Sequence, residues 1–130
     1  MYSWDISVEK KDFRIKDRGI LLFVIRISGS LDAYTFPNLE ETIQRLFEGD
    51  NYNIIINMER LNYISSAGLG VLMSMVKKLR EKDGDIKLTN LPHKIHGILD
   101  LLGFTTVLEI YTEEEEAATA FLHGSKKEQI

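Results

Sequence analysis

The chain has 130 residues, of which 44% are hydrophobic and 28% charged, with a formal net charge of −4. This length and balance predict one globular domain and exclude a disordered or membrane-spanning chain, since the longest apolar run covers only residues 20–25. The absence of cysteine excludes disulfides, thiolate metal sites and cysteine nucleophiles, and it fits a reducing cytoplasm. The start of the chain is not a secretory signal, and the scattered lysine pairs predict no direct nucleic-acid binding.

The first thirty residues predict two neighbouring strands. Apolar and polar residues alternate over residues 4–8, and residues 13–15 continue the alternation after a charged break. Residues 17–19 form a turn signal directly before the apolar strand at 20–28. We therefore expect an antiparallel hairpin at one end of a sheet, with residues 1–12 as an N-terminal extension or extra strand.

Helices and strands alternate along the rest of the chain. The expected order is a helix between Thr35 and Gly49, a strand at 53–58, a helix from the paired serines to before Gly84, a strand at 86–89, a helix from Pro92 to before Gly103, a strand at 107–111 and a helix that begins at 113–116. This alternation predicts an α/β domain at 13–123, a mixed sheet of four to five strands with about four helices packed on it, and a flexible tail at 124–130.

Two loops of this predicted sheet carry conspicuous polar side chains. Parallel strands joined by helices place their functional loops at the carboxyl ends of the strands. One loop covers residues 28–35, with Asp32 in the middle, and the other covers residues 62–66 and ends in two serines. We therefore expect Asp32 to lie beside Ser65 and Ser66.

The segment Ser-Ser-Ala-Gly-Leu-Gly at residues 65–70 permits two interpretations. Serine is a preferred N-cap, so Ser65 or Ser66 can simply cap the helix that follows. The small residues of the first turn also leave the N–H groups of the helix start open, which suits an anion such as a phosphoryl group. This arrangement is a physical reason to expect a phosphorylation site, beside the simpler reading of a cap.

Other site chemistries find little support in the sequence. A serine nucleophile needs a general base, and the segment lacks the Gly-x-Ser-x-Gly elbow of hydrolases, so we do not expect an enzyme that uses Ser66 with Asp32. His93 and His96 share a helix face but have no evident third metal ligand, and we interpret them as surface histidines. Residues 113–116 are interpreted as a solvated helix start. We predict no catalytic residue, no metal and no cofactor.

Three segments, taken in order, carry a more specific pattern. The stretch NYISSAGLGVLMSMVKKLR follows the strand NIIINMERL, as in a strand, short loop and Asp-Ser-(Ser/Thr/Ala)-Gly-Leu-Gly helix start. Upstream, ISGSLDAYTFPNLEETI is similar to a Gly-(Glu/Asp)-(Leu/Ile)-Asp segment, and downstream KLTNLPHKIHGILDLLGFTTVLEIY is similar to a strand, helix and Gly-Leu/Phe turn. Over roughly residues 13–122, these segments resemble the STAS domain family, the anti-sigma-factor antagonists.

The resemblance implies a phosphoacceptor at Ser66, two residues before Gly68, with Ser65 as the second choice. Many phosphorylated members have aspartate where this chain has Ser65, so the chain departs from the family pattern there. Asp32 matches the acidic residue that lies near the phosphoacceptor in the family. The partner-binding residues that the resemblance implies are Asp32, Ser65, Ser66, Ala67 and Gly68.

The resemblance also implies partner switching in the bacterial cytoplasm. The unmodified domain would bind an anti-sigma factor, a serine kinase of the histidine-kinase-like ATPase family, and so free a sigma factor for transcription. Phosphorylation of Ser66 would dissociate the complex, and a PP2C-type phosphatase would reset it. The chain would then be a binding module and a kinase substrate, not an enzyme. The alternative is a STAS scaffold or transport-accessory module in which the serines only cap the helix.

Overall fold

The computed structural model describes residues 4–123, so the tail expected at 124–130 lies outside the described residues. Within the described part, five strands form one sheet in the order β1-β2-β3-β4-β5. β1 is antiparallel to β2, and the other neighbouring strands are parallel. The predicted α/β fold with a mixed sheet is therefore confirmed.

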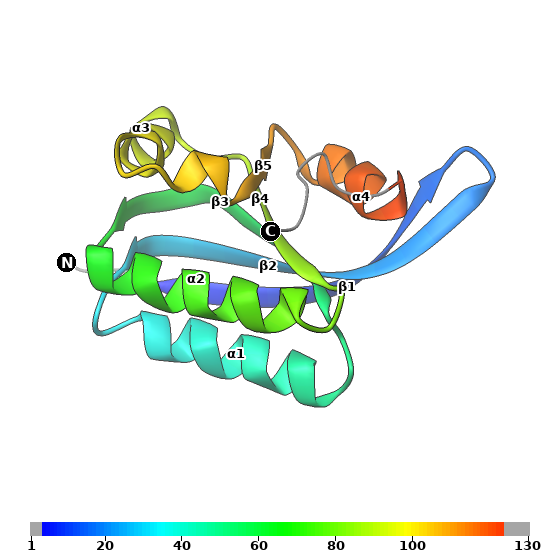
Figure 1. Cartoon of the computed structure of the whole chain (residues 1–130), viewed down its shortest axis with the longest axis horizontal. Helices are drawn as coiled ribbons and strands as arrows, with labels where there is room; N and C mark the ends of the chain where they lie inside the picture. Colours follow the sequence, from blue (N-terminus) through cyan, green and yellow to red (C-terminus); the bar gives the residue numbers. More distant parts are fainter. Residues whose placement is uncertain (1–3, 124–130) are drawn as a thin grey trace.

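The elements follow the chain in the predicted alternation. The strands are β1 (Asp5–Ile15), β2 (Arg18–Leu31), β3 (Asn53–Ile64), β4 (Asp85–Thr89) and β5 (Glu109–Tyr111). The helices are α1 (Phe36–Glu48), α2 (Ser66–Arg80), α3 (His93–Leu101) and α4 (Glu114–His123), with a short 3-10 helix η1 (Phe104–Thr106). Figure 1 shows α1 and α2 side by side on one face of the sheet and α4 on the other, and the buried side chains of α3 pack in the same apolar cluster as those of α1 and α2.

The β1–β2 hairpin is longer than the sequence pattern indicated. All 11 residues of β1 pair with β2, so the charged stretch at 9–12 does not interrupt the strand. β1 therefore crosses the expected boundary between an extension at 1–12 and the domain at 13–123. An edge strand tolerates this charged stretch because much of its side-chain surface faces solvent. The far end of the hairpin projects beyond the sheet, next to α4 (Figure 1).

Two hydrophobic clusters hold the layers together. The larger cluster includes Ile54 and Ile56 of β3 with the buried residues of α1, α2 and α3, whereas Ile55 belongs to a second cluster under α4. Successive side chains of a strand point to opposite faces, so a strand that is covered on both faces carries apolar residues at consecutive positions. This explains why residues 54–56 are apolar without alternation.

The chain between α3 and β5 differs from the prediction. The third helix was expected to continue to the residue before Gly103, but Leu102 lies just after the end of α3 and is exposed. Val107 was expected to open the last strand, but it is exposed and precedes β5. The 3-10 helix η1 takes up residues between them, so that β5 is left with three residues.

Gly84 leads into β4 at a place where the backbone leaves no room for a side chain. A Cβ atom at this position would lie 2.1 Å from the carbonyl oxygen of Tyr52, the same oxygen that accepts a hydrogen bond from the Asp85 N–H. We predict that Gly84→Ala lowers the free energy of unfolding by about 1–3 kcal/mol because the backbone must shift. Chemical denaturation measures this loss. Gly97→Ala is the control, since a Cβ there meets no atom within 4 Å, and equal stability of both variants would contradict the prediction.

Candidate functional site

Asp32 and the paired serines meet at the carboxyl edge of the sheet. β2 and β3 are parallel, with Leu31 opposite Ile64 at their ends. The Ser65 N–H donates a hydrogen bond to the Leu31 carbonyl oxygen at 2.9 Å. Because Asp32 directly follows Leu31, the structure brings the two predicted loops together.

The two serines at the start of α2 have different roles. Ser65 occupies the N-cap position with extended backbone (φ −87°, ψ 162°), and its Oγ accepts a hydrogen bond from the Gly68 N–H at 3.1 Å. Ser66 is the first residue of the helix, and its side chain is exposed. The cap is therefore Ser65, which leaves the Ser66 side chain accessible to a partner.

The small residues that follow the serines also differ from one another. Gly68 is buried, and a Cβ there would lie 3.0 Å from the Leu31 carbonyl oxygen, so it serves the packing of α2 on the end of β2. Ala67 and Gly70 are exposed, and a Cβ at Gly70 would meet no atom within 4 Å. Backbone N–H groups in the first turn, such as that of Ala67, have no partner within the helix. The helix start is thus open on its solvent side.

The Asp32 loop is braced by Thr35. The Thr35 hydroxyl donates to the Ser30 carbonyl oxygen at 2.6 Å and accepts from the Asp32 N–H at 2.9 Å. Thr35 occupies the N-cap position of α1, as predicted, but this buried hydroxyl does not cap the helix. The Asp32 carboxylate accepts a hydrogen bond from the Tyr34 N–H at 3.0 Å, which holds the turn in shape.

Two exposed tyrosines lie near the same edge of the sheet, and no motif of the sequence pointed to them. Tyr34 follows Asp32 in the β2–α1 loop and is 89% exposed, and Tyr63 near the end of β3 is 47% exposed. Tyr63 is paired with Ser30 across the two strands. No local pattern marks these positions, because their proximity depends on the pairing of strands that lie far apart in sequence.

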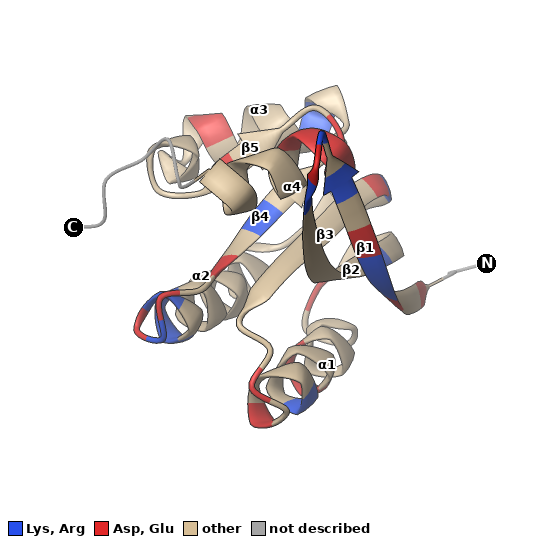
Figure 2. Ribbon diagram, turned by 90° about the vertical axis from the view of Figure 1, so that its right-hand side faces the viewer, with Lys and Arg blue, Asp and Glu red and all other residues tan. Residues whose placement is uncertain are grey.

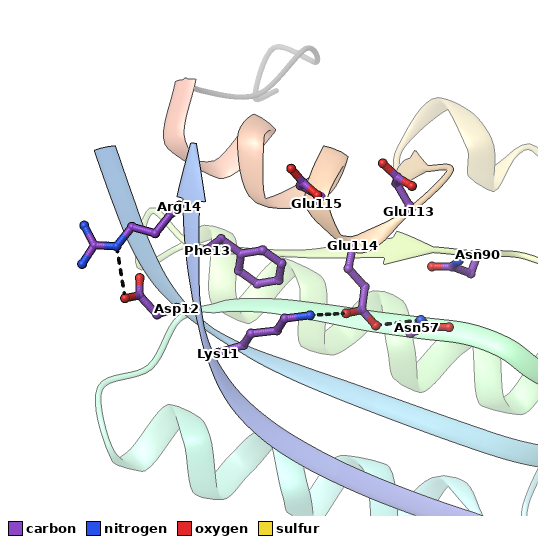
Figure 3. A pocket seen from close by; sticks show the side chains of 9 residues that line it. All are labelled: Lys11, Asp12, Phe13, Arg14, Asn57, Asn90, Glu113, Glu114 and Glu115. Carbon is purple, nitrogen blue, oxygen red and sulfur yellow. Dashed lines mark hydrogen bonds and ion pairs between the residues drawn. The ribbon is translucent and has the colours of Figure 1, made fainter. Parts of the chain in front are cut away.

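A second polar cluster lies under α4, on the other face of the sheet (Figure 3). The Glu114 carboxylate accepts hydrogen bonds from Arg26 at 2.8 and 2.9 Å and from the Asn57 amide at 2.7 Å, and it pairs with Lys11 at 3.5 Å. The interpretation of residues 113–116 as a solvated helix start is therefore wrong for Glu114, whose side chain is only 13% exposed. Figure 2 shows the acidic first turn of α4 beside the basic positions of the hairpin.

The surroundings of Glu114 set its charge state. Burial raises the pKa of this carboxyl, but the hydrogen bonds from Arg26 and Asn57 and the charges of Arg26 and Lys11 outweigh burial, so the pKa lies below its ordinary value. The same contacts with Glu114, and those with Glu9, raise the pKa of Arg26. The cluster is therefore an ion-pair network that fastens α4 to β1, β2 and β3.

Lys87 forms a further ion cluster in the interior. Its ammonium group lies 3.1 Å from Asp85 and 3.2 Å from Glu109, and the three side chains are less than a tenth exposed. Burial raises the pKa of Glu109, but the hydrogen bond from Tyr111 and the charge of Lys87 together lower it by more than burial raises it. The net shift of the pKa is therefore downward. These charges are paired and closed to solvent, which is typical of a structural cluster rather than a catalytic one.

An open pocket of about 410 Å³ lies beside Glu114. Its lining residues are Lys11, Asp12, Phe13, Arg14, Asn57, Asn90, Glu113, Glu114 and Glu115 (Figure 3). The pocket belongs to the α4 face of the sheet, whereas Ser66 begins a helix of the opposite face. Among residues 4–123, no three His, Asp or Glu side chains gather as metal ligands, and His93 and His96 are both exposed. No helix in this part of the chain is both long and apolar enough to span a bilayer.

Comparison with known proteins identifies the family. The profile of the STAS domain matches residues 13–117. The chain belongs to the STAS domain family. An anti-sigma F factor antagonist from Paenibacillus polymyxa is 30% identical over 106 residues, which cover 78% of this chain and 86% of that protein. The resemblance carried by the three sequence segments is confirmed.

Solved structures share the fold of this STAS domain. The unphosphorylated form of the anti-sigma factor antagonist SpoIIAA superposes with a TM-score of 0.66 and 22% identity, over 89% of this chain and 97% of that one. The phosphorylated form of SpoIIAA from Bacillus gives a TM-score of 0.60 and 23% identity, over 88% of this chain and 99% of that one. At this level of identity the two structures establish the common fold.

The distinct positions of the two serines generate a stability prediction for the STAS domain. We expect Ser65→Ala to lower the free energy of unfolding by about 1 kcal/mol, because it removes the side-chain cap of α2. Ser66→Ala should change it by less than about 0.5 kcal/mol, because an exposed first-turn side chain is removed. Urea denaturation of both variants compares the two values, and a larger loss for Ser66→Ala would contradict this assignment of the cap.

The Glu114 network generates a prediction about pH. Because the pKa is lowered in the folded state, the stabilisation is present above the ordinary carboxyl pKa of 4.5 and is lost as the pH falls through the lower, folded-state pKa. We expect Glu114→Gln to lower the free energy of unfolding by about 1–2 kcal/mol at pH 7, a figure already discounted for solvent screening. The difference in stability from the original chain should shrink as the pH falls through the folded-state pKa of Glu114. Denaturation from pH 7 to pH 3 measures it. The exposed neighbour Glu115→Gln is the control, and a pH-independent difference for Glu114→Gln would contradict the ion-pair assignment.

Proposed function

We propose that this STAS domain is an anti-sigma-factor antagonist that works by partner switching. In its unmodified form it binds an anti-sigma factor, a serine kinase of the histidine-kinase-like ATPase family, and so frees a sigma factor. The kinase phosphorylates Ser66 and the complex dissociates, and a PP2C-type phosphatase restores the unmodified form. The 30% identical relative is an anti-sigma F factor antagonist, which supports this function.

One observation carries the choice of Ser66. Ser65 caps α2, so the exposed Ser66 side chain is not needed as the cap of this helix. In the transfer, Ser66 Oγ forms a bond to the γ-phosphorus of ATP, the bond to the ADP oxygen breaks, and a base of the kinase takes the hydroxyl proton. The chain is the substrate and binding module of this reaction and performs no catalysis itself.

The helix start can hold the added charge without a change of fold. A phosphoryl group brings about −1.5 to −2 charge at pH 7, and the positive end of the helix dipole partly compensates it. Within an interface, the same charge facing like charge or lacking a partner costs on the order of several kcal/mol. Each 1.4 kcal/mol changes affinity about tenfold, so release of the partner by a hundredfold or more requires only the new charge.

Ser65 stands where many family members have aspartate, and this difference affects the choice of Ser66 as phosphoacceptor less than the sequence suggested. Serine in place of the family aspartate removes one negative charge beside Ser66. The Ser65 hydroxyl, however, is partly buried and accepts the capping hydrogen bond, so it is a poorer acceptor for phosphate than Ser66. Of the five expected partner-binding residues, Gly68 is buried and acts by positioning the helix, while Asp32, Ser65, Ser66 and Ala67 reach the surface. Because the kinase and ATP work in the cytoplasm, the proposal places the chain there.

Kinase treatment followed by mass spectrometry tests the proposal. The chain is incubated with Mg-ATP and the anti-sigma serine kinases encoded in its genome, and we expect one phosphate, on Ser66. Ser66→Ala should abolish phosphorylation while it keeps kinase binding, and Ser66→Asp should weaken binding in part. Asp32→Asn should slow phosphorylation while stability changes by no more than about 0.5 kcal/mol.

The controls separate the remaining alternatives. Ser65→Ala should still accept phosphate on Ser66, so phosphate found on Ser65 in the original chain would move the site by one residue. Absence of phosphate with every kinase would contradict the switch and favour the STAS scaffold or transport-accessory module.

A further inference from the structure

Thr35 occupies the N-cap position of α1, but its hydroxyl serves the neighbouring loop instead of the helix. Its backbone is helical (φ −109°, ψ −30°), whereas a capping residue usually has an extended backbone, and its side chain makes no capping hydrogen bond. The residue is only 3% exposed, so the hydroxyl must find its partners inside the protein. Those partners lie at the end of β2 and in the β2–α1 loop.

The Thr35 hydroxyl lies at the centre of the loop that carries Asp32. It donates to the Ser30 carbonyl oxygen at 2.6 Å and accepts from the Asp32 N–H at 2.9 Å. The hydroxyl oxygen also lies 3.3 Å from Asp32 Oδ1, the oxygen that accepts from the Tyr34 N–H at 3.0 Å. One buried side chain thus fixes the end of the strand, the backbone of Asp32 and the carboxylate of Asp32 relative to one another.

The Asp32 loop and the paired serines are both attached to the end of β2, but by different contacts. Leu31 accepts the hydrogen bond of the Ser65 N–H at 2.9 Å. This bond does not involve Thr35, so the start of α2 should keep its place when the Thr35 hydroxyl is removed. The position of the Asp32 carboxylate relative to Ser66, in contrast, depends on that hydroxyl.

We propose that Thr35 is a positioning residue for the phosphorylation of Ser66. Its buried hydroxyl holds the Asp32 carboxylate in the orientation that the kinase meets during phosphate transfer. Phosphoryl transfer depends mainly on positioning and electrostatics, so a displaced carboxylate beside the acceptor slows it. This role rests on the proposed function, because Thr35 acts through Asp32 on the same site.

Thr35→Val and Thr35→Ser form a matched pair that tests this role. Valine keeps the shape of the side chain without the hydroxyl, whereas serine keeps the hydroxyl. With Mg-ATP and the kinase that phosphorylates Ser66, we expect Thr35→Val to lower kcat/KM for the chain about tenfold or more and Thr35→Ser to lower it by less than about threefold. The rates are measured well below the thermal midpoint of each variant, so that every chain is folded.

A double-mutant cycle with Asp32→Asn separates positioning from a loss of stability. Because Thr35 acts through Asp32, Thr35→Val should change the rate by less than about twofold once Asp32→Asn is present. Effects that multiply instead overturn the positioning role, as does an unchanged rate in Asp32→Asn alone.

Amide hydrogen exchange tests the same contacts without the kinase. The Asp32 N–H should exchange about tenfold faster or more in Thr35→Val, because its side-chain acceptor is lost. The Ser65 N–H should keep its protection, because Leu31 still accepts its hydrogen bond. Equal loss of protection at both amides would show a general loosening of this edge and overturn the role.

Thr89→Val is the control for the removal of a buried hydroxyl. Thr89 in β4 is 0% exposed, and its hydroxyl has no hydrogen-bond partner among the described residues. Thr89→Val should leave the phosphorylation rate of Ser66 within about twofold of the original chain without lowering the midpoint of thermal unfolding. Thr35→Val should lower this midpoint by roughly 2–8 °C, because it removes buried hydrogen bonds.

The outcomes distinguish the positioning role from the proposed function. An unchanged rate in Thr35→Val, or an equal loss in Thr89→Val, overturns the positioning role, while phosphate on Ser66 of the original chain keeps the proposed function intact. Failure of the original chain to accept phosphate from any of the kinases overturns both.

Discussion

The hydrogen bond from the Ser65 N–H to the Leu31 carbonyl oxygen joins the two loops on which the candidate site depends. It continues the parallel pairing of β2 and β3 beyond the last paired residues, so the start of α2 is fixed to the end of β2. Gly68 strengthens this restraint, because only a residue without a large side chain lets the helix pack against the Leu31 carbonyl oxygen. Asp32, the next residue after Leu31, is thereby brought to the same edge of the sheet as the serines.

The two faces of the sheet are stabilised by different physical means. On the face of α1 and α2, a continuous apolar cluster holds the helices, so the edge with Ser66 stands on a rigid base. On the other face, α4 is fastened by a smaller apolar cluster together with the Glu114 network and the buried Lys87 cluster. Charged groups in such positions require complete pairing, because removal of one partner leaves an uncompensated charge in a poorly solvated place. The charged clusters therefore serve the attachment of α4, and the proposed phosphorylation site lies on the opposite face.

The site at the start of α2 separates stability from function at the level of single residues. Ser65 caps the helix and Gly68 packs it, and both are needed by the fold. Ser66 and Gly70 contribute little to the fold and face solvent on the same side of the helix. Under the proposed function, this separation lets Ser66 gain or lose a phosphoryl group without disturbing the core underneath. The two structures of SpoIIAA, in its unphosphorylated and phosphorylated forms, superpose on the same fold of this chain.

The order and type of the main helices and strands, the family and the meeting of the two polar loops could be predicted from the amino-acid sequence. Periodicity acts over a few residues, and parallel strands joined by helices bring their carboxyl ends to one edge, so these features can be derived locally. The choice of the serine that caps α2 could not be predicted in this way, because Ser65 and Ser66 are equally good caps in isolation. The structure alone also joined Glu114 to Arg26, 88 residues away in sequence, and extended β1 through a charged stretch. The difference between Gly68 and Gly70 has the same origin: identical residues in one motif acquire different roles because one meets the end of β2 and the other meets solvent.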